Sequence, residues 1–519
     1  MVCTQMAQLF LKNKLTANFI LLGIVLIGFA LRMHDLKKHD LWFDEVITYE
    51  HISMAYSGEN KNFVNNYLEK NPPFYFVLLR QWSKIFGQSE FSLRLLSCLL
   101  GVLSIVLLYK VSRLFFSRSV SLLAAFFLAL SPFQLWYSQE VRAFSLSVFL
   151  SLLNTYFILK ALKSDDNRYW LCYFFSLSCL LFTTYFSFLL FIPQAVLILY
   201  NRKFILKWLI ALLGANLLFL IFIYPSFTHQ FALLQYKNWV PSPDGAGFIL
   251  FSLNNFVIGY NAGPVAYNAS LLLILWMSFF ACFNMPVRTM IILLSFLAAP
   301  IILVFIFSKI FFPIYLDRSL IIFCPFLYIV LSKGVSAIKY GWLKSLVILS
   351  FLVCIGLSLV NYYYDALPDR SSNTVIFLKR PVRPLVDLFL LNKENGDVIG
   401  FSNYGFMSTF RHYLRQESKE YSEIPKYYFF ISPGDEFFES EIQNMRSFGF
   451  KSELKFIDVN KDNLGSLINK RIWVFSTSWK RQGSLEPYAR KVKMWFDKHC
   501  WKIREWYDDG VWIAIYRLK

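Results

Sequence analysis

The stretch ILLGIVLIGFALRMHDLKKHDLWFDEVITYEHI, residues 20–52, contains the two features that decide the fold. It begins inside an apolar run that is long enough to cross a bilayer core of about 30 Å as a helix. About ten residues after that run, the carboxylate pair Asp44 and Glu45 follows Trp42 and Phe43. An acidic pair set among aromatics just beyond an apolar segment is unexpected in a chain that has little charge.

The whole composition extends the first of these features. The 519 residues are 56% hydrophobic, 19% aromatic and only 16% charged, and the mean hydropathy is +0.47. In soluble domains, about a quarter of the residues are charged. Solid apolar runs favour helices over the alternating segments of a membrane β-barrel. We predict a polytopic α-helical membrane protein with about eleven spans, near residues 17–33, 92–109, 119–135, 143–161, 169–183, 186–200, 208–225, 267–283, 289–307, 319–332 and 345–361.

The basic residues predict the orientation of these spans. The net charge is +19, but many Lys and Arg side chains sit in short loops between apolar runs, so we exclude nucleic acid as the partner. The basic loops alternate along the chain if residues 169–200 form two short spans that turn at Thr183, Thr184 and Tyr185. They are then all cytoplasmic: Lys12 and Lys14; Lys110, Arg113 and Arg118; Lys163 and Arg168; Arg202, Lys203 and Lys207; Arg288; Lys333, Lys339 and Lys344.

The N-terminal span and the cysteines add two expectations. No cleavage site of the A-x-A type follows the first apolar run, so we expect it to be retained and not to act as a signal peptide. Most of the eight cysteines lie within apolar runs, which does not indicate a disulfide framework. We expect a multi-pass protein of the cytoplasmic (inner) membrane with a cytoplasmic N-terminus.

The remaining segments would lie outside. Residues 1–361 form the predicted transmembrane domain, and its first outer segment, 34–91, is too long and too aromatic for a simple connector. Residues 362–519 alternate strand-like runs (DVIGFS, KYYFFI, RIWVFST, GVWIAIY) with helical patterns such as LEPYARKVKMWFDKHC. This alternation predicts a C-terminal extracytoplasmic α/β domain.

Further charged residues recur at the predicted outer membrane face. Glu140 and Arg142 lie in SPFQLWYSQEVRAFSL (131–146), and Asp317 and Arg318 lie in YLDRSLIIFCP (315–325). Charged groups at a membrane boundary are costly unless they are paired or hydrated, so they mark functional cavities. An ion pair between Glu140 and Arg142 that orders the turn is the structural alternative, and a solvated loop is the alternative for Asp44.

These residues suit the transfer of a sugar from a lipid phosphate. The leaving group is a phosphate, whose developing charge the guanidinium forks of Arg142 and Arg318 would stabilise. The acceptor is a hydroxyl, and a carboxylate must take its proton as the new bond forms. Asp44 is the candidate for that base.

Four stretches in this order resemble the GT-C class of membrane glycosyltransferases, and most of all its family-39-like group. That group holds the protein O-mannosyltransferases and the lipid A aminoarabinose transferase. The stretches are LWFDE, NPPFYFVLLRQWSKIFGQSEFSLRLLS, SPFQLWYSQEVRAFSL and YLDRSLIIFCPFLYIVLSKGV, between residues 41 and about 335. We take the substrate-binding candidates from them: Glu45, Arg94, Tyr137, Glu140, Arg142, Asp317 and Arg318.

The resemblance implies that an acid of the first outer loop, here Asp44, is the general base. It also implies inversion at the anomeric carbon and a polyprenyl-phosphate sugar donor, with a lipopolysaccharide, glycolipid, glycan or protein hydroxyl as acceptor. Two positions depart from the pattern: Arg318 is followed by Ser319 where relatives usually have Tyr, and Tyr185 stands near a position that is often His. The first departure favours Arg142 over Arg318 as the phosphate-binding residue. Because of the second, and because the sequence has no HxxxH motif or dense carboxylate cluster, we expect no cofactor and no tightly bound metal, although some enzymes of the class use a divalent ion.

Three other functions remain open. A flippase or transporter for lipid-linked sugars would more often show inverted repeats and charges near the membrane midplane. An O-antigen ligase would place its largest outer loop late in the chain, whereas the acidic loop here comes first. A non-catalytic scaffold would leave LWFDE and SQEVR unexplained.

Overall fold

The computed structural model describes residues 14–54, 72–233, 240, 242–243, 245–366, 381–402, 404–417, 427–431, 454–458, 467, 469–477, 487–508 and 511–518. The chain divides into two compact units. The helical unit comprises Met1–Leu36, Asn62–Ala232 and Val240–Arg370, and the sheet unit comprises Lys37–Lys61, Leu233–Trp239 and Ser371–Lys519. The acidic stretch of the first outer segment therefore groups with the C-terminal part of the chain. The boundary at residues 361/362 stays a prediction.

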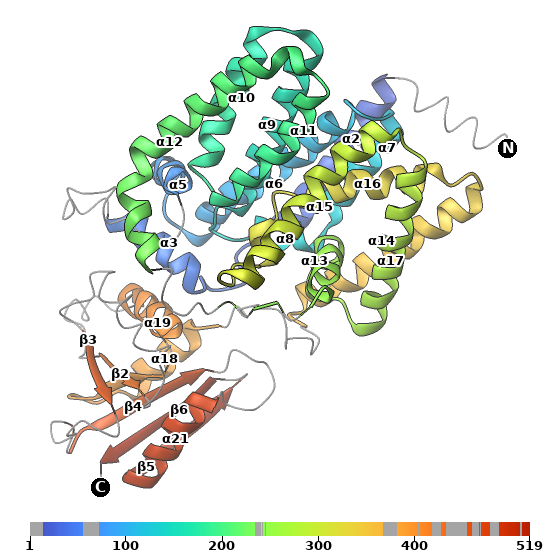
Figure 1. Cartoon of the computed structure of the whole chain (residues 1–519). Helices are drawn as coiled ribbons and strands as arrows, with labels where there is room; N and C mark the ends of the chain where they lie inside the picture. Colours follow the sequence, from blue (N-terminus) through green and yellow to red (C-terminus); the bar gives the residue numbers. More distant parts are fainter. Residues whose placement is uncertain are drawn as a thin grey trace. The chain divides into compact units, whose positions relative to one another are not determined.

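The helical unit is built from apolar helices with short connections (Figure 1). Its elements are α2 (Lys14–Met33), α5 (Phe74–Phe86), α6 (Glu90–Ser112), α7 (Arg118–Leu130), α8 (Pro132–Ser138), α9 (Phe144–Ser164), α10 (Asn167–Leu181), η1 (Tyr185–Leu190), α11 (Phe191–Leu199), η2 (Arg202–Phe204), α12 (Ile205–Leu233), α13 (Gly247–Ile258), α14 (Pro264–Phe283), α15 (Val287–Ile310), η3 (Asp317–Leu320), α16 (Cys324–Ala337) and α17 (Gly341–Tyr363). Helix α13 lies in a segment that the sequence predicted as a loop.

All eleven predicted spans are helical, which confirms the fold class, but their number needs correction. Seven helices of the described chain are long and apolar enough to cross a membrane, or eight if the bent pair α7–α8 is one span. The other three predicted spans correspond to α10, η1–α11 and α16, of which α10 has 15 residues and α16 has 14. At 1.5 Å per residue such helices reach only about 20 Å, less than the core of a bilayer.

Four of the predicted basic loops meet at one end of the helical unit. The Lys163 ammonium donates to the Leu114 carbonyl (2.6 Å), and Lys207 pairs with Asp165 (3.0 Å). Arg288 donates to the Tyr200 carbonyl at 3.4 Å. Contacts between successive loops confirm that these loops share one end of the bundle.

The turn at Thr183 lies away from those basic loops. The Phe74 N–H, which belongs to the first outer segment, donates to the Phe182 carbonyl (2.8 Å). Helices α10 and α11 therefore run to this turn and back, so residues 169–200 form two helices as predicted.

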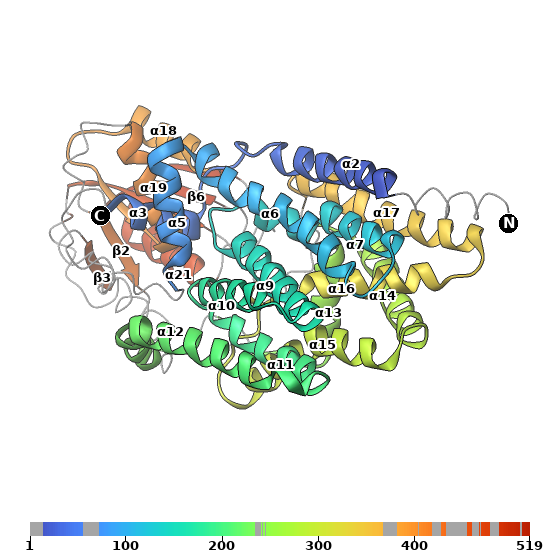
Figure 2. The same ribbon diagram turned by 90° about the horizontal axis from the view of Figure 1, so that it is seen from above.

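Close helix packing holds the bundle together. Helix α2 packs against α6 and α7, and α14 packs against α16 and α17 (Figures 1 and 2). Gly334 of α16 approaches α14 so closely that a Cβ atom there would lie 2.2 Å from the Met277 carbonyl oxygen. Small residues allow such contact between membrane helices, and an alanine at this position would force the two helices apart.

The sheet unit contains α3 (Phe43–Met54), α18 (Arg383–Asn392), β1 (Val398–Phe401), α19 (Tyr404–Glu417), β2 (Tyr427–Ile431), β3 (Leu454–Asp458), β4 (Arg471–Thr477), α21 (Pro487–His499), β5 (Cys500–Asp508) and β6 (Val511–Leu518). Its six strands have the order β3-β2-β1-β4-β6-β5. The first four are parallel, and β6 and β5 are antiparallel to their neighbours. The four strands predicted from the sequence are confirmed as β1, β2, β4 and β6.

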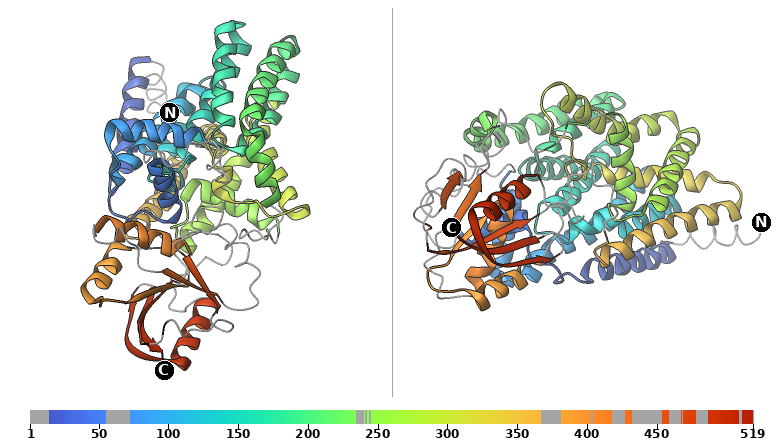
Figure 3. Two further views of the ribbon diagram at one scale, coloured as in Figure 1. Left: turned by 90° about the vertical axis from the view of Figure 1, so that its left-hand side faces the viewer. Right: turned by 90° about the horizontal axis from the view of Figure 1, so that it is seen from below.

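Side chains alternate between the two faces of this sheet. Helix α21 covers one face (Figures 1 and 3). Its Val492 and Phe496 belong to one buried cluster with Val474, Trp512 and Tyr516 of the strands. The opposite face carries an aromatic cluster of Phe389 from α18, Phe406 and Phe410 from α19, and Phe401, Trp473 and Phe475 from the strands. A sheet covered on both faces is typical of α/β domains with parallel strands.

Candidate active site

A sharp bend between α7 and α8 positions most of the candidate residues of the helical unit. The two helices meet at 57°. Pro132, at the first position of α8, has no N–H to donate to the carbonyl of Leu128, four residues earlier. The Ser131 hydroxyl accepts from the Gln134 N–H (3.3 Å) and donates to the Phe256 carbonyl of α13 (3.0 Å). The turn SPFQLWYSQE therefore leaves the axis of α7 at a defined angle.

Arg32, at the end of α2, replaces the hydrogen bonds that the bend removes. Its guanidinium is fully buried and donates to the carbonyls of Leu128 (3.2 Å) and Ala129 (2.9 Å) and to the Ser138 hydroxyl (3.2 Å). Gly101 leaves room for this arrangement, because a Cβ atom there would lie 2.4 Å from the Ser138 Oγ. Arg32 thus ties α2 to both sides of the bend.

Residues just after the bend are held by equally specific contacts. The Gln139 amide donates to the backbone carbonyls of Arg32 (2.9 Å) and His34 (2.7 Å), and the Tyr362 hydroxyl donates to its oxygen. The Glu140 carboxylate is buried and accepts from the Trp136 indole N–H (2.8 Å). The turn therefore presents a carboxylate whose orientation is set by an aromatic neighbour.

Tyr137 connects this turn to the late charged pair. Its hydroxyl lies 3.0 Å from that of Tyr260, and it is within electrostatic range of Arg318, Glu140 and Asp317. The structure thus brings Tyr137, Glu140, Asp317 and Arg318 together, although the sequence separates the two pairs by about 180 residues.

Asp317 is fixed by α13. Its carboxylate accepts from the Asn255 amide (2.6 Å) and from the Ser252 hydroxyl, and that hydroxyl also contacts the Tyr315 hydroxyl at 2.8 Å. Burial raises the pKa of the Asp317 carboxyl, although the two donors oppose the shift. Arg318 follows in the same 3-10 turn and is partly exposed.

The two remaining arginines of the prediction occupy different environments. Arg94 of α6 is 1% exposed, donates to the Leu36 carbonyl (3.2 Å), and is within electrostatic range of Tyr362, as Glu140 is. Arg142 is partly exposed, and its carbonyl accepts from the Ser97 hydroxyl at 3.5 Å. Arg94 is therefore buried and tied to the backbone beyond α2, whereas Arg142 is partly exposed.

Asp44 and Glu45 lie in the first turn of α3, within the sheet unit. The buried Glu45 carboxylate accepts from the Trp42 N–H (3.3 Å), so it caps the helix that it begins. The Asp44 carbonyl accepts from the Thr48 hydroxyl (2.8 Å), while its side chain is partly exposed. Of the two carboxylates, Glu45 makes this structural contact and Asp44 is the more exposed, and their proposed roles in the reaction stay predictions.

Contacts with α18 and α19 hold α3 in place. Asp40 accepts from the Val382 and Arg383 N–H groups at the start of α18 (2.6 and 2.9 Å) and pairs with the Arg383 guanidinium at 3.2 Å. The Tyr413 hydroxyl accepts from the Leu41 N–H (2.6 Å). The C-terminal part of the chain thus fixes the segment that carries Asp44.

A histidine of α19 contacts α3 itself. The ring of His412 packs edge-on against that of Tyr49, with centroids 4.7 Å apart, and its Nε2 lies 3.1 Å from the Gln416 amide. Burial lowers the pKa of His412 to about 4, and Arg383 and Arg415 add to the effect. His412 is therefore neutral at neutral pH.

Sequence reasoning missed Arg32, Gln139, Tyr260, Tyr362 and the donors Ser252 and Asn255. A signal was present for two of them, because Arg32 ends an apolar run and Asn255 interrupts another. Within the described ranges, no group of three or more His, Cys, Asp or Glu side chains is placed to hold a metal ion. Metal dependence remains a prediction.

The fold and this arrangement define an integral membrane protein with the GT-C fold. The structure resembles ArnT from Cupriavidus metallidurans in its apo state, with a TM-score of 0.61, 11% identity, and coverage of 95% of this chain and 97% of that one. It resembles the same protein bound to undecaprenyl phosphate with a TM-score of 0.58, 12% identity and the same coverage. An Archaeoglobus fulgidus oligosaccharyltransferase tethered to an acceptor peptide matches with a TM-score of 0.51 and 13% identity, over 97% of this chain and 74% of that one.

A sequence family described as dolichyl-phosphate-mannose-protein mannosyltransferase matches residues 70–229. This region includes Arg94, Tyr137, Glu140 and Arg142 but not Asp44, Asp317 or Arg318. No curated protein sequence matches the chain significantly.

Proposed function

We propose that the chain is an inverting glycosyltransferase that moves a sugar from a polyprenyl-phosphate donor to a hydroxyl of a cell-envelope acceptor. The main support is the likeness to ArnT over nearly the whole chain, together with the grouping of Tyr137, Glu140, Asp317 and Arg318 in the helical unit. The structure of ArnT with undecaprenyl phosphate supports a lipid phosphate as the donor. Acceptors are a lipopolysaccharide, another glycolipid or glycan, or a protein.

The reaction is a single displacement. The acceptor oxygen attacks the anomeric carbon of the donor, and the bond from that carbon to the phosphate oxygen breaks, so polyprenyl phosphate leaves. The Asp44 carboxylate takes the proton of the acceptor hydroxyl. Attack from the side opposite the phosphate inverts the anomeric centre.

The charge that develops on the departing phosphate needs donors with fixed geometry. Arg142, which is partly exposed, and Arg318, which lies beside the hydrogen-bonded Asp317, supply guanidinium forks for it. Tyr137 and Glu140 orient the sugar. Glu45 acts indirectly, because its contact with the Trp42 N–H keeps the first turn of α3 in place.

The chain spans the inner membrane with its N-terminus in the cytoplasm and the sheet unit outside. The gathering of the basic loops at one end of the bundle supports this orientation. A reporter enzyme that works only outside the cytoplasm, fused after residue 365, should be active. Activity of a cytoplasmic reporter at that point would reverse the orientation.

The activity itself is tested by mass analysis of envelope glycans. Cells that lack the protein should lack one sugar residue of defined mass, and the wild-type chain should restore it, whereas the Asp44→Asn chain should not. Identical glycans, glycolipids and glycoproteins in both strains would contradict the proposal.

A further inference from the structure

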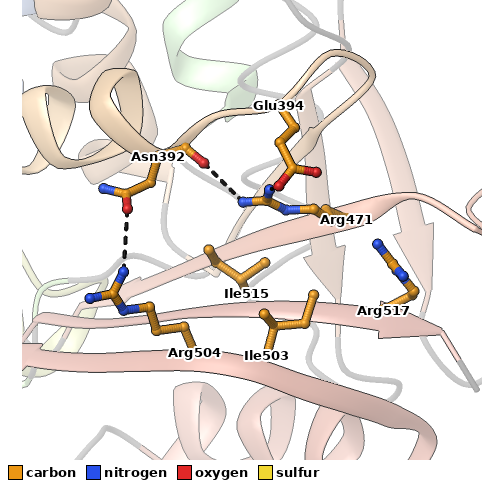
Figure 4. Close-up of a pocket in the computed structure, with 7 residues that line it drawn as sticks. All are labelled: Asn392, Glu394, Arg471, Ile503, Arg504, Ile515 and Arg517. Atoms are coloured by element: carbon orange, nitrogen blue, oxygen red, sulfur yellow. Dashed lines mark hydrogen bonds and ion pairs between the residues drawn. The ribbon is translucent and has the colours of Figure 1, made fainter.

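A basic pocket opens on the sheet unit and is lined by residues that have no role in the proposed reaction. It has a volume of about 440 Å³ (Figure 4). Its lining residues are Asn392, Glu394, Arg471, Ile503, Arg504, Ile515 and Arg517. Arg471 pairs with acids, whereas Arg504 and Arg517 make no ion pair among the described residues, so these two leave an excess of two unpaired positive charges.

The strand register explains why the arginines converge. Arg471 of β4 lies directly opposite Arg517 of β6, and Arg504 of β5 lies opposite Ile515 of the same strand. The register of β5 shifts between Lys502 and Arg504, so Ile503 is the extra residue of a β-bulge. Like charges directly opposite each other destabilise a sheet, and the register nevertheless places two arginines in this relation.

Arg471 is already engaged within the protein. Its guanidinium pairs with Glu394 and lies 3.5 Å from the Asp397 carboxylate, and it donates to the Asn392 carbonyl (2.9 Å). Burial, with Arg517 as a further cause, lowers the pKa of Arg471. This side chain joins the end of α18 to β4, and its structural contacts use most of its donors.

Arg504 and Arg517 keep most of their donors. Arg504 makes one long hydrogen bond, to the Asn392 side-chain oxygen (3.4 Å), and stacks on Trp506 with 4.9 Å between guanidinium carbon and ring centroid. Arg517 is exposed and pairs with no acid among the residues that the structure describes. Figure 4 shows Ile503 and Ile515 between these two side chains, as an apolar floor.

We propose that this pocket binds a phosphate monoester attached to a sugar or to a lipid head group. A phosphate monoester carries a charge of about −1.5 to −2 at neutral pH, which matches the excess of the pocket better than the single charge of a carboxylate does. The forks of Arg504 and Arg517 would each donate two N–H groups to its oxygens. The attached carbon skeleton would lie on Ile503 and Ile515.

The volume is consistent with this ligand. Small-molecule sites span about 300–1,000 Å³ and combine an apolar lining with a few placed polar groups. The pocket therefore has room for a phosphorylated sugar, or for a phosphorylated head group whose chains remain outside. The proposal does not depend on the transfer reaction, because no residue of the pocket takes part in it.

The test is a binding titration of the full chain, purified in a maltoside detergent, at about pH 8. Inorganic phosphate and glucose 1-phosphate are the probes, followed by the broadening of their phosphorus NMR signals. The wild-type protein should bind both saturably, with a dissociation constant in the range of about 1 mM or tighter. Added salt should weaken binding, since the pocket is open to solvent.

Variants locate the bound phosphate. Arg517→Gln should weaken binding at least about tenfold, because each charge-assisted pair is worth about that much, and Arg504→Gln combined with it should abolish binding. Arg490→Gln is the matched control, since Arg490 is exposed and belongs to α21 on the opposite face of the sheet. Arg142→Gln tests the proposed donor site. If Arg142→Gln loses phosphate binding and Arg517→Gln keeps it, the phosphate does not bind in the pocket, but the proposed function still stands.

Two further arms distinguish the sources of the phosphate. Displacement of glucose 1-phosphate by nanodiscs that contain phosphatidate, but not by phosphatidylcholine nanodiscs, assigns the pocket to a lipid head group. If glucose 1-phosphate stays bound in the presence of either kind of nanodisc, the pocket is assigned to a sugar phosphate. Either result supports the site. Absence of saturable binding up to about 10 mM, or equal binding by Arg517→Gln and Arg490→Gln, would overturn the proposal.

Discussion

The helical unit and the sheet unit contribute different parts of the proposed reaction. The helical unit gathers Tyr137, Glu140, Asp317 and Arg318, and Asn255 fixes Asp317. The sheet unit holds Asp44 on a helix that α18 and α19 keep in place. The groups proposed to bind the leaving phosphate therefore belong to one unit, and the proposed general base belongs to the other.

The units also treat charged side chains differently. Arg32 of the helical unit is enclosed and satisfied by carbonyl oxygens, as expected where water is scarce. Arg504 of the edge strand β5 and Arg517 of its neighbour β6 are exposed and have donors to spare. Arg32 thus has a structural role in the first unit, whereas Arg504 and Arg517 of the second unit are proposed to bind a ligand. Variants of each unit should therefore fail in different ways.

The largest effect should follow removal of the proposed base. Asp44→Asn keeps size and shape but cannot take the proton, and general-base catalysis is worth about 10²–10⁴-fold. The kcat for transfer from a purified polyprenyl-phosphate sugar should fall at least about 100-fold, while donor affinity stays close to that of the wild type. The measurement is single-turnover transfer in nanodiscs, with a separate titration of donor binding.

Glu45→Gln is the matched control for this change. A glutamine at this position can still accept from the Trp42 N–H, so its loss of turnover should be much smaller. Near-normal turnover of Asp44→Asn would move the base elsewhere, with Glu140 as the next candidate. Equal, severe loss in both variants would point to disruption of α3 and not to a missing base.

The second effect concerns stability. Arg32→Met removes the donors to Leu128, Ala129 and Ser138, and each orphaned buried group costs about 1–3 kcal/mol. We expect a loss on the order of 3–5 kcal/mol and a clear fall in Tm in detergent. Arg168→Met, at an exposed site of the basic end, should leave the Tm nearly unchanged. A Tm for Arg32→Met equal to that of the control would refute the structural role of the buried arginine.

The third effect distinguishes the helical unit from the sheet unit, because it should appear in donor affinity and not in the proton-transfer step. Arg142→Lys keeps the charge but loses the bidentate fork, so donor affinity should weaken about tenfold. The same titration of donor binding measures it, with Arg168→Lys as the control. Unchanged affinity and turnover would assign Arg142 to the ordering of its turn.

The smallest effect is a dependence of stability on pH. The pKa of His412 is about 4 when folded and near 6.5 when unfolded, so the unfolded chain binds more protons between these values. Stability from this group is complete above about pH 6.5 and falls toward pH 4, by up to about 1.4 kcal/mol per pH unit. The Tm, measured by thermal unfolding at several pH values between 4 and 6.5, should therefore change less with pH for His412→Gln than for the wild type. Parallel profiles for the two proteins would show that His412 does not titrate in this way.

The sequence predicted the fold class well because apolar length and basic loops are local signals. It placed the turn at Thr183, where the Phe182 carbonyl meets the Phe74 N–H. It overestimated the number of helices that have the length of a full span, because a helix of 14 residues such as α16 is apolar but shorter than a bilayer core. It also missed α13, β3 and β5, since none of them has a pattern distinct from its surroundings.

Single residues of the candidate site could be predicted from the sequence, but their grouping in space could not. Charged residues at predicted span ends identified Glu140 and Asp317, which the structure brings to the same tyrosine. The grouping of Asp44 with the C-terminal part of the chain was not predictable, because it rests on contacts such as that between Leu41 and Tyr413, 372 residues apart. Long-range hydrogen bonds of this kind leave no periodic trace in a sequence.

The central claim is that this chain transfers a sugar from polyprenyl phosphate by inversion. It is tested most directly by supplying the purified protein, in nanodiscs, with a synthetic polyprenyl-phosphate sugar and an envelope extract as acceptor. We predict that polyprenyl phosphate is released in equal amount to the glycosylated product, and that the new linkage has the opposite anomeric configuration. Movement of the intact donor across a liposome membrane, without release of polyprenyl phosphate, would contradict the claim and identify a flippase instead.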